Sequence, residues 1–124
     1  MKKLEQLLDR YPLLYRGFPG FECHDGWYDL LDELSATLEA HLKAHHPEWV
    51  AGGEPVVQQV KEKFASLRFY MALYDEVIDT AIRQAEERSY ETCERCGLPG
   101  QLIESGWYRI RCEGCYLMEQ EQQR

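Results

Sequence analysis

Apolar residues recur at helical spacing over residues 26–45, and this is the clearest periodic pattern in the chain. Asp25 stands before the run, where its carboxylate is predicted to cap the helix, and Pro47 is predicted to end it. At about 100° per residue the apolar positions form one stripe, and the opposite face is acidic. The stripe comprises Trp27, Leu30, Leu31, Leu34, Leu38 and Leu42. We therefore expect a helix with one buried face and one charged face.

Two shorter stretches repeat with the same period. Residues 3–15 carry apolar side chains at helical spacing, but Pro12 is predicted to end or bend this helix. Between this helix and the next, residues 17–21 read as a loop whose two phenylalanines anchor it in the core. Residues 76–90 are predicted to form a helix capped by Asp75, with inward positions Val77, Ile78, Ala81, Ile82 and Ala85.

The middle of the chain changes from helical spacing to alternation. Residues 47–55 contain two prolines and a Gly-Gly pair, so we expect a loop. Residues 56–61 begin with β-branched side chains, and residues 66–73 alternate between apolar and polar, which predicts two strands. They are expected to meet around residues 63–65, although this turn has neither glycine nor asparagine. The predicted fold class is α+β, a small helical domain with a β-hairpin.

Four cysteines dominate the last third of the chain. Cys93 and Cys96 form one CxxC pair, Cys112 and Cys115 form a second, and fifteen residues separate the pairs. This spacing is typical of a structural zinc site that holds one Zn²⁺ ion. Four protein thiolates would leave no open position for water or substrate, so the pattern argues against a catalytic metal. A redox dithiol is the alternative, and it would need a thioredoxin-like βαβ context that this sequence lacks.

The residues around the cysteines predict how the module folds. Gly97 suits the left-handed turn after a zinc knuckle, and Ser105-Gly106 is predicted to be the two-residue turn of a hairpin. A short helix is expected to start at the second cysteine pair. Knuckle, hairpin and helix in this order are typical of a treble-clef finger, with a zinc ribbon as the near alternative. We expect a domain over residues 1–90 and a zinc finger over residues 91–124.

Composition and charge limit the classes of function and the types of partner that we expect for this chain. The chain is 44% hydrophobic and 29% charged, and no apolar run approaches the roughly 18 residues that a bilayer crossing needs. The N-terminus lacks the apolar stretch of a signal peptide, so a reducing cytoplasm with metal-bound thiolates is expected. The net charge of −8 disfavours non-specific binding to a phosphate backbone and suits a protein partner with a basic surface. The alternative is that the acidity serves only solubility.

Two other groups invite a catalytic or metal-binding interpretation. Cys23 with His24 has the residue types of a thiol nucleophile and its base, but a catalytic partner usually lies far away in sequence. His41 and His45 share a helix face, yet the residue after His41 is leucine and not the glutamate of zinc metalloproteases. We interpret these two histidines and His46 as partly buried side chains at a helix C-terminus, where the helix dipole favours them.

The finger carries the one basic and aromatic patch in the sequence, which comprises Arg95, Trp107, Arg109 and Arg111. Zinc fingers often present such a surface to nucleic acid or to protein. In the predicted hairpin Trp107, Arg109 and Arg111 share one face, with Tyr108 and Ile110 on the other. Alternatively, Trp107 packs the finger onto the helical domain and the arginines are solvated. Treble-clef nucleases are excluded, since they need further histidine and asparagine ligands, and no histidine follows His46 and the chain has no asparagine.

Six short strings along the chain form a recognisable set. They are Tyr11-Pro12, Gly26-Trp27-Tyr28-Asp29-Leu30, Val60-Lys61-Glu62-Lys63-Phe64, Leu67-Arg68-Phe69-Tyr70, Cys93-Glu94-Arg95-Cys96-Gly97 with Pro99-Gly100, and Gly106-Trp107-Tyr108 before Cys112. Together they resemble a group of small uncharacterised bacterial and prophage-encoded proteins that end in a zinc finger. In these relatives glycine often stands at the position of Ala65. The resemblance covers most of the chain and implies no activity, but a prophage setting favours a small protein that binds and modulates host machinery.

The sequence thus predicts a non-enzymatic zinc-binding accessory protein that binds a protein partner, with no indication of its oligomeric state. One form of this hypothesis is a phage-type inhibitor whose acidic face mimics nucleic acid. The first alternative is a nucleic-acid-binding zinc-finger regulator, and the second is a hydrolase that uses Cys23 and His24. The predicted partner-binding residues are Arg95, Trp107, Arg109 and Arg111 on the finger, and Asp29, Asp32 and Glu33 on the acidic helix face.

Overall fold

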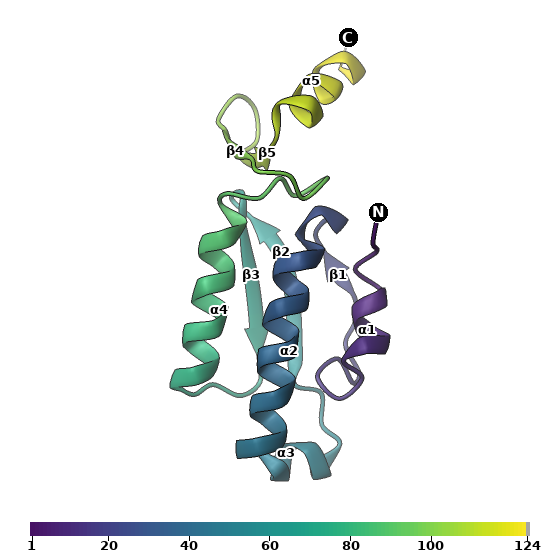
Figure 1. Cartoon of the computed structure of the whole chain (residues 1–124), viewed down its shortest axis with the longest axis vertical. Coiled ribbons are helices and arrows are strands. Elements are labelled where there is room, and N and C mark those ends of the chain that lie inside the picture. The colour runs from purple at the N-terminus through teal and green to yellow at the C-terminus, as the bar shows by residue number, and fades with distance from the viewer. Residues whose placement is uncertain (124) are drawn as a thin grey trace.

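The computed structural model describes residues 1–123 and has an α+β fold, as the sequence predicted. Helices α2 and α4 lie side by side against one face of a three-stranded sheet, and the cysteine-containing segment extends from one end of this layered body (Figure 1). The elements in chain order are α1 (Gln6–Arg10), β1 (Phe21–Glu22), the 3-10 turn η1 (Asp25–Trp27), α2 (Tyr28–His45), α3 (Pro47–Gly52), β2 (Val57–Lys63), β3 (Ser66–Met71), α4 (Glu76–Ser89), β4 (Gln101–Ile103), β5 (Arg109–Arg111) and α5 (Glu113–Gln122).

The predicted hairpin in the middle of the chain is confirmed. Strands β2 and β3 pair antiparallel, with Val60 opposite Phe69, and β1 adds a short parallel strand on the outer side of β2. The turn consists of Phe64 (φ 51°) and Ala65 (φ 78°), both in the left-handed region that a tight two-residue hairpin turn requires. The side chain of Glu62 accepts a hydrogen bond from the Ala65 N–H at 2.8 Å. The turn is therefore tight without glycine, at the position where glycine would fit most easily.

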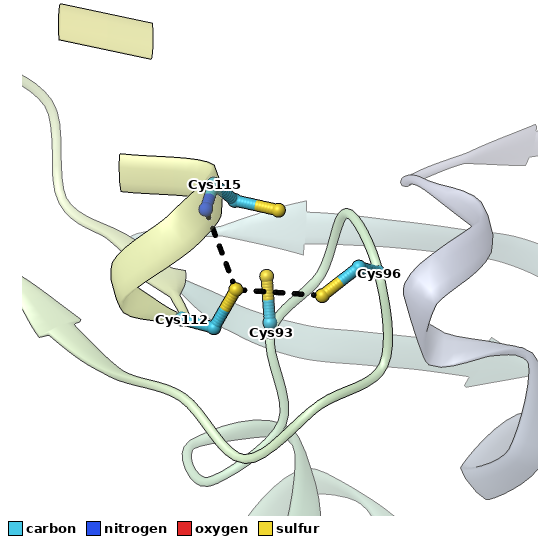
Figure 2. A group of neighbouring side chains, drawn as sticks. All are labelled: Cys93, Cys96, Cys112 and Cys115. Atoms are coloured by element: carbon cyan, nitrogen blue, oxygen red, sulfur yellow. Dashed lines mark hydrogen bonds between the residues drawn. The ribbon is translucent and has the colours of Figure 1, made fainter. Parts of the chain in front are cut away.

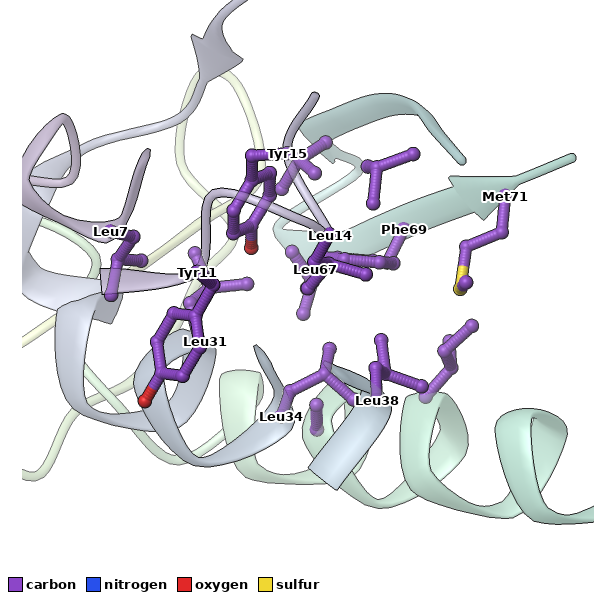
Figure 3. Close-up of a cluster of buried hydrophobic side chains, with 14 of the residues drawn as sticks. Leu7, Tyr11, Leu14, Tyr15, Leu31, Leu34, Leu38, Leu67, Phe69 and Met71 are labelled. Carbon is purple, nitrogen blue, oxygen red and sulfur yellow. The ribbon is translucent and has the colours of Figure 1, made fainter. Parts of the chain in front are cut away.

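The core lies between the helices and the sheet (Figure 3). The apolar stripe of α2 is buried there, because leucines at i, i+3 and i+4 face the alternate apolar positions of β3. Tyr15, Phe18 and Phe21 pack ring against ring with centroids 4.9–5.4 Å apart, so the loop phenylalanines do anchor the 17–21 segment as expected. The buried hydroxyl groups of Tyr15 and Ser35 satisfy each other at 2.6 Å.

Three helix boundaries differ from the sequence expectation. Helix α1 ends at Arg10 instead of continuing to residue 15, because Pro12 disfavours the helical conformation at the residue before it. Residues 47–55 contain the short helix α3, which begins at Pro47 and stops before Gly53, a left-handed residue at φ 77°. Asp25 does not cap α2, since its carboxylate accepts the backbone N–H of Leu4 at 2.9 Å instead.

Helix α4 is confirmed with its cap. The Asp75 carboxylate accepts the Ile78 N–H at 2.9 Å, which satisfies one of the free donors of the first turn. Ile78, Ile82 and Ala85 are buried, but Val77 is 48% exposed and not inward as predicted. The reason is geometric, since Val77 lies about 100° around the helix from Ile78 and the buried stripe is narrow.

The cysteine-containing segment docks on η1 through hydrogen bonds to its backbone carbonyl groups. The Gly26 N–H donates to the Glu94 carbonyl at 2.8 Å, and the indole N–H of Trp27 donates to the Thr92 carbonyl at 3.1 Å. A Cβ atom on Gly26 would lie 2.3 Å from the Glu94 carbonyl oxygen, so only glycine allows this approach. The division into a 1–90 domain and a 91–124 module stays a prediction.

Among residues 1–123, no helix combines the length and the apolar character that a bilayer crossing requires.

Replacing Gly26 with alanine should lower the free energy of unfolding by about 1–3 kcal/mol, because the new methyl group meets backbone atoms that cannot rotate away. Urea unfolding of the full chain measures this. Gly52→Ala is the matched control, since nothing lies within 4 Å of its added Cβ, and it should leave the midpoint unchanged or raise it slightly. Equal midpoints for the two variants would show that the close approach at Gly26 is not a structural constraint.

Candidate metal centre

The four cysteines of the two CxxC pairs converge on one point. Their Sγ atoms all lie within 4.8 Å of one another, with Cys96 and Cys112 3.5 Å apart, and Figure 2 shows the side chains turned toward a common centre. Tetrahedral coordination with metal–sulfur bonds of about 2.3 Å requires sulfur–sulfur separations of about 3.8 Å. All five cysteines of the chain are free thiols. The group can therefore hold a single metal ion after small side-chain adjustments.

The first pair is presented by a tight knuckle. Gly97 adopts φ 85°, as predicted for the left-handed position, and its N–H donates to the Cys93 carbonyl at 2.9 Å. The Cys93 N–H in turn donates to the Leu98 carbonyl at 2.8 Å. These two bonds fold the chain back on itself, so both thiols of the pair point to the same side.

The second pair is presented by the start of α5, as expected. Cys112 is the N-cap residue, and its Sγ accepts the Cys115 N–H at 3.4 Å. This hydrogen bond outweighs burial and lowers the pKa of Cys112 to about 7. Burial raises the pKa of Cys96 and of Cys115. These two thiols therefore stay protonated until a metal ion displaces their protons. Metal binding at this group would release protons.

The hairpin between the pairs differs from the prediction. Strands β4 and β5 pair antiparallel, with Leu102 opposite Ile110, but residues 104–108 form a five-residue loop. The expected two-residue turn at Ser105-Gly106 is wrong, although Gly106 does take a positive φ of 81°. The longer loop leaves Trp107 and Tyr108 outside the strand pairing.

Glu119 on α5 binds the arginines of the finger. Its carboxylate accepts hydrogen bonds from Arg111 Nε at 2.9 Å, Arg95 Nη1 at 3.1 Å and Arg109 Nε at 3.2 Å. Burial opposes ionisation of Glu119, but the arginines outweigh it and lower the pKa of this carboxyl group. Arg111 also reaches Glu94, with 3.6 Å between Nη1 and Oε1. Two buried arginines thus face two buried carboxylates.

This network removes half of the predicted basic surface. Arg109 is 1% and Arg111 4% exposed, so neither guanidinium is available to a phosphate group in solvent. Arg109 lies under the ring of Trp107, with its guanidinium carbon 4.0 Å from the ring centroid. Trp107 itself is 52% exposed, and Arg95 remains partly exposed beside the knuckle. Arg109 and Arg111 share the carboxylate of Glu119 and Trp107 stacks on Arg109, so these three side chains lie together as expected, but the two arginines face α5 and not solvent.

The three acidic residues of α2 that were predicted to bind a partner differ in their exposure and in the residues they contact. Asp29 is exposed and lies 3.9 Å from Lys2 Nζ. Asp32 is half-buried and accepts the Tyr11 hydroxyl at 2.6 Å, whereas Glu33 is exposed and pairs with Arg88 of α4. None of the three lies on the finger, so the structure does not bring the acidic and the basic candidates together.

The Cys23–His24 pair does not have the arrangement of a nucleophile and its base. Burial and the negative field of Glu94 raise the pKa of the Cys23 thiol far above its usual range, so it stays protonated. The His24 ring is bound elsewhere, with Nδ1 2.8 Å from the Glu94 carboxylate. Glu94 also accepts the His24 N–H at 3.0 Å, which makes this histidine part of the finger's docking contact.

A group that sequence reasoning missed lies at the far end of α2. The rings of His41 and His46 both point to Asp75 at the start of α4, and the His45 ring lies beside that of His41 with 4.9 Å between their centroids. The Nε2 atoms of His41 and His46 lie 2.7 Å and 2.6 Å from Asp75 Oδ2. The interval of about thirty residues between the histidines and Asp75 gave no local signal for this contact.

Removal of metal should unfold the finger and leave the helical body intact. In a strong chelator we expect amide protons over residues 93–118 to exchange rapidly, since this short segment buries few apolar side chains of its own. Amides of α2 and α4 should stay protected, because their core does not include the cysteines. Persistent protection over 93–118 in the chelator would contradict a metal-dependent fold.

Glu119→Gln should destabilise the finger strongly. It leaves the buried guanidinium of Arg109 without a carboxylate and that of Arg111 with Glu94 alone, and breaking a buried pair in this way typically costs about 3–5 kcal/mol. The measurement is chelator-induced metal release, which should be faster in this variant, together with the urea midpoint. Glu121→Gln, at an exposed position of the same helix, is the matched control and should behave as the unmodified chain.

The comparisons with known proteins add no assignment to this geometry. The described residues offer a closed group of four thiols, a buried arginine–glutamate network that supports it, and a separate histidine–aspartate group at the other end of α2. No protein family, no curated protein and no solved structure matches the chain.

Proposed function

We propose that this chain is a non-enzymatic, zinc-binding accessory protein that binds a protein partner through its finger. Four thiolates favour Zn²⁺ over harder ions such as Mg²⁺, and their set fills a tetrahedron without leaving a position for substrate. The order of knuckle, hairpin and helix supports the treble-clef type among zinc fingers. In this proposal the ion stabilises the fold of the finger, and the surface of the finger binds the partner.

The exposure of apolar side chains on the finger carries this proposal. Twelve large hydrophobic side chains are exposed within residues 1–123, and six of them lie in the short segment 98–118. We propose that these side chains together form one interaction surface, because contiguous exposed apolar patches mark protein-interaction sites, whereas single apolar side chains scattered over a surface need no explanation. The six are Leu98, Leu102, Trp107, Tyr108, Leu117 and Met118.

The charge of the chain supports a partner of the opposite sign. The net charge is −8, and Asp29 and Glu33 on α2 are exposed, although both have a basic neighbour. Long-range attraction between opposite charges speeds association, and it contributes more to the choice of partner than to the affinity. We propose a partner with a basic surface, such as a nucleic-acid-binding protein that a phage-type inhibitor would block, in a reducing cytoplasm where all five cysteines stay free.

The nucleic-acid-binding alternative has weaker support. Its basic patch depended on Arg109 and Arg111, and both guanidinium groups are already neutralised by Glu119 and Glu94. A binder of DNA or RNA would show affinity that falls steeply with salt and weakens in Arg95→Ala. We expect no saturable binding at low salt. The hydrolase alternative has still less support, since the Cys23 thiol is held in its protonated form.

The partner is to be identified by affinity capture from the cells that produce this protein, followed by mass spectrometry and binding measurements with the purified proteins. Leu117→Ser and Met118→Ser should each weaken binding at least about tenfold, as expected when an apolar contact at an interface centre is lost. Both residues are exposed on α5, so the fold should be unaffected. Metal removal should abolish binding together with the finger fold.

Val77→Ser is the matched control for these variants. Val77 is an aliphatic residue on α4 with similar exposure to Leu117, but it lies outside the finger. Its replacement should leave partner binding unchanged. Unaltered affinity in both α5 variants and in Trp107→Ala would refute the finger as the binding surface.

A further inference from the structure

We propose that His41, His46 and Asp75 form a second metal site, for a divalent transition metal ion such as Zn²⁺ or Co²⁺. It is separate from the cysteine group and lies at the opposite end of α2. Two imidazoles and one carboxylate are a ligand set that such ions accept in proteins. The site does not depend on the function proposed for the finger.

Three helix ends bring the ligands together. His41 lies one turn before the end of α2, His46 is the residue between α2 and α3, and Asp75 caps α4. Their ligand atoms all lie within 4.8 Å of one another. Both imidazole Nε2 atoms address the same carboxylate oxygen, although either ring could have turned to solvent at the end of its helix. The three groups are thus held facing one another before any ion is present.

The distances fit an ion after a small opening of the group. Nε2 of His41 and of His46 lie 2.7 Å and 2.6 Å from Asp75 Oδ2, which are hydrogen-bond distances. Tetrahedral coordination at about 2.0–2.1 Å needs ligand separations of about 3.3 Å. A side-chain movement of well under 1 Å therefore makes room. The ion replaces the two N–H hydrogens that bridge the rings to the carboxylate.

The surroundings of the ligands have the features of a metal site. Glu48 of α3 lies 3.6 Å from Nδ1 of His46, so a negative charge stands near the ring nitrogen that would not bind the ion, although the distance is longer than a hydrogen bond. Asp75 is held in place, because its other oxygen, Oδ1, accepts the Ile78 N–H at 2.9 Å. This hydrogen bond leaves Oδ2 of Asp75 free to face the centre of the group.

Burial and coordination number indicate what the site does. The side chains of His41, His46 and Asp75 are 11%, 19% and 30% exposed, so the ion can enter from solvent and is still shielded on most sides. Three protein ligands leave at least one position for water. Because the ligands come from α2, the α2–α3 junction and α4, a bound ion would clamp these helix ends together.

The test uses the untagged full chain with its cysteine group first loaded with Zn²⁺. Titration with Co²⁺ should reveal a second equivalent by equilibrium dialysis, with the weak visible absorption of a nitrogen- and oxygen-ligated ion and without the intense thiolate charge-transfer bands of the cysteine group. His46→Ala and Asp75→Asn should each weaken this second equivalent by at least about a hundredfold. Asparagine also caps helices well, so Asp75→Asn should preserve α4.

His45→Ala is the matched control, because His45 neighbours both histidine ligands but is exposed and outside the ligand group. It should bind the second ion as the unmodified chain does. If the unmodified chain binds only one ion at millimolar Co²⁺, the second site does not exist. A second equivalent that survives His46→Ala and Asp75→Asn, or that is lost in His45→Ala, would overturn the assignment of these ligands. None of these outcomes bears on whether the finger binds a partner.

Discussion

Two buried arginines and two buried carboxylates hold the finger in place. A guanidinium group out of water is costly unless a carboxylate meets it, and here Arg111 lies between Glu119 on α5 and Glu94 in the knuckle. Because one end of this network is on α5 and the other on the knuckle, it fixes the distance between the two CxxC pairs. The Glu94 carboxylate also accepts the backbone N–H of His24 and contacts its ring, so the same series of contacts joins the finger to the body.

The internal use of these arginines changes what the finger offers to a partner. Side chains that would have made a cationic surface are neutralised within the module, and its large apolar side chains are left outside. A surface of this kind suits a protein better than a phosphate backbone, since it has contact area but little free positive charge. In the proposed complex, the acidity of the rest of the chain would add selectivity to that contact.

The two groups of potential metal ligands contrast in how they are built. Each cysteine pair comes from one short turn, so its two thiols are brought together locally and only the two pairs must meet. The histidine–aspartate group is assembled from three helix ends and exists only when α2, α3 and α4 are packed. An ion at the first would hold a small module that lacks a core, whereas an ion at the second would tighten a body that already has one.

The sequence by itself determined the features that depend on near neighbours: α2 and α4 from their 3.6-residue periodicity, the β2–β3 hairpin from alternation, and the cysteine group from its spacing. The tertiary structure alone decided which charged side chains are buried and which partners they meet. From the sequence, Arg109 and Arg111 were predicted to form a basic surface, but in the folded structure both bind Glu119 of α5. The sequence indicated only that His41, His45 and His46 are partly buried side chains at a helix end, whereas packing brings Asp75 between His41 and His46. Periodicity fixes which face of an element is buried, but the identity of the contact across that face depends on how distant elements pack, and no local pattern encodes it.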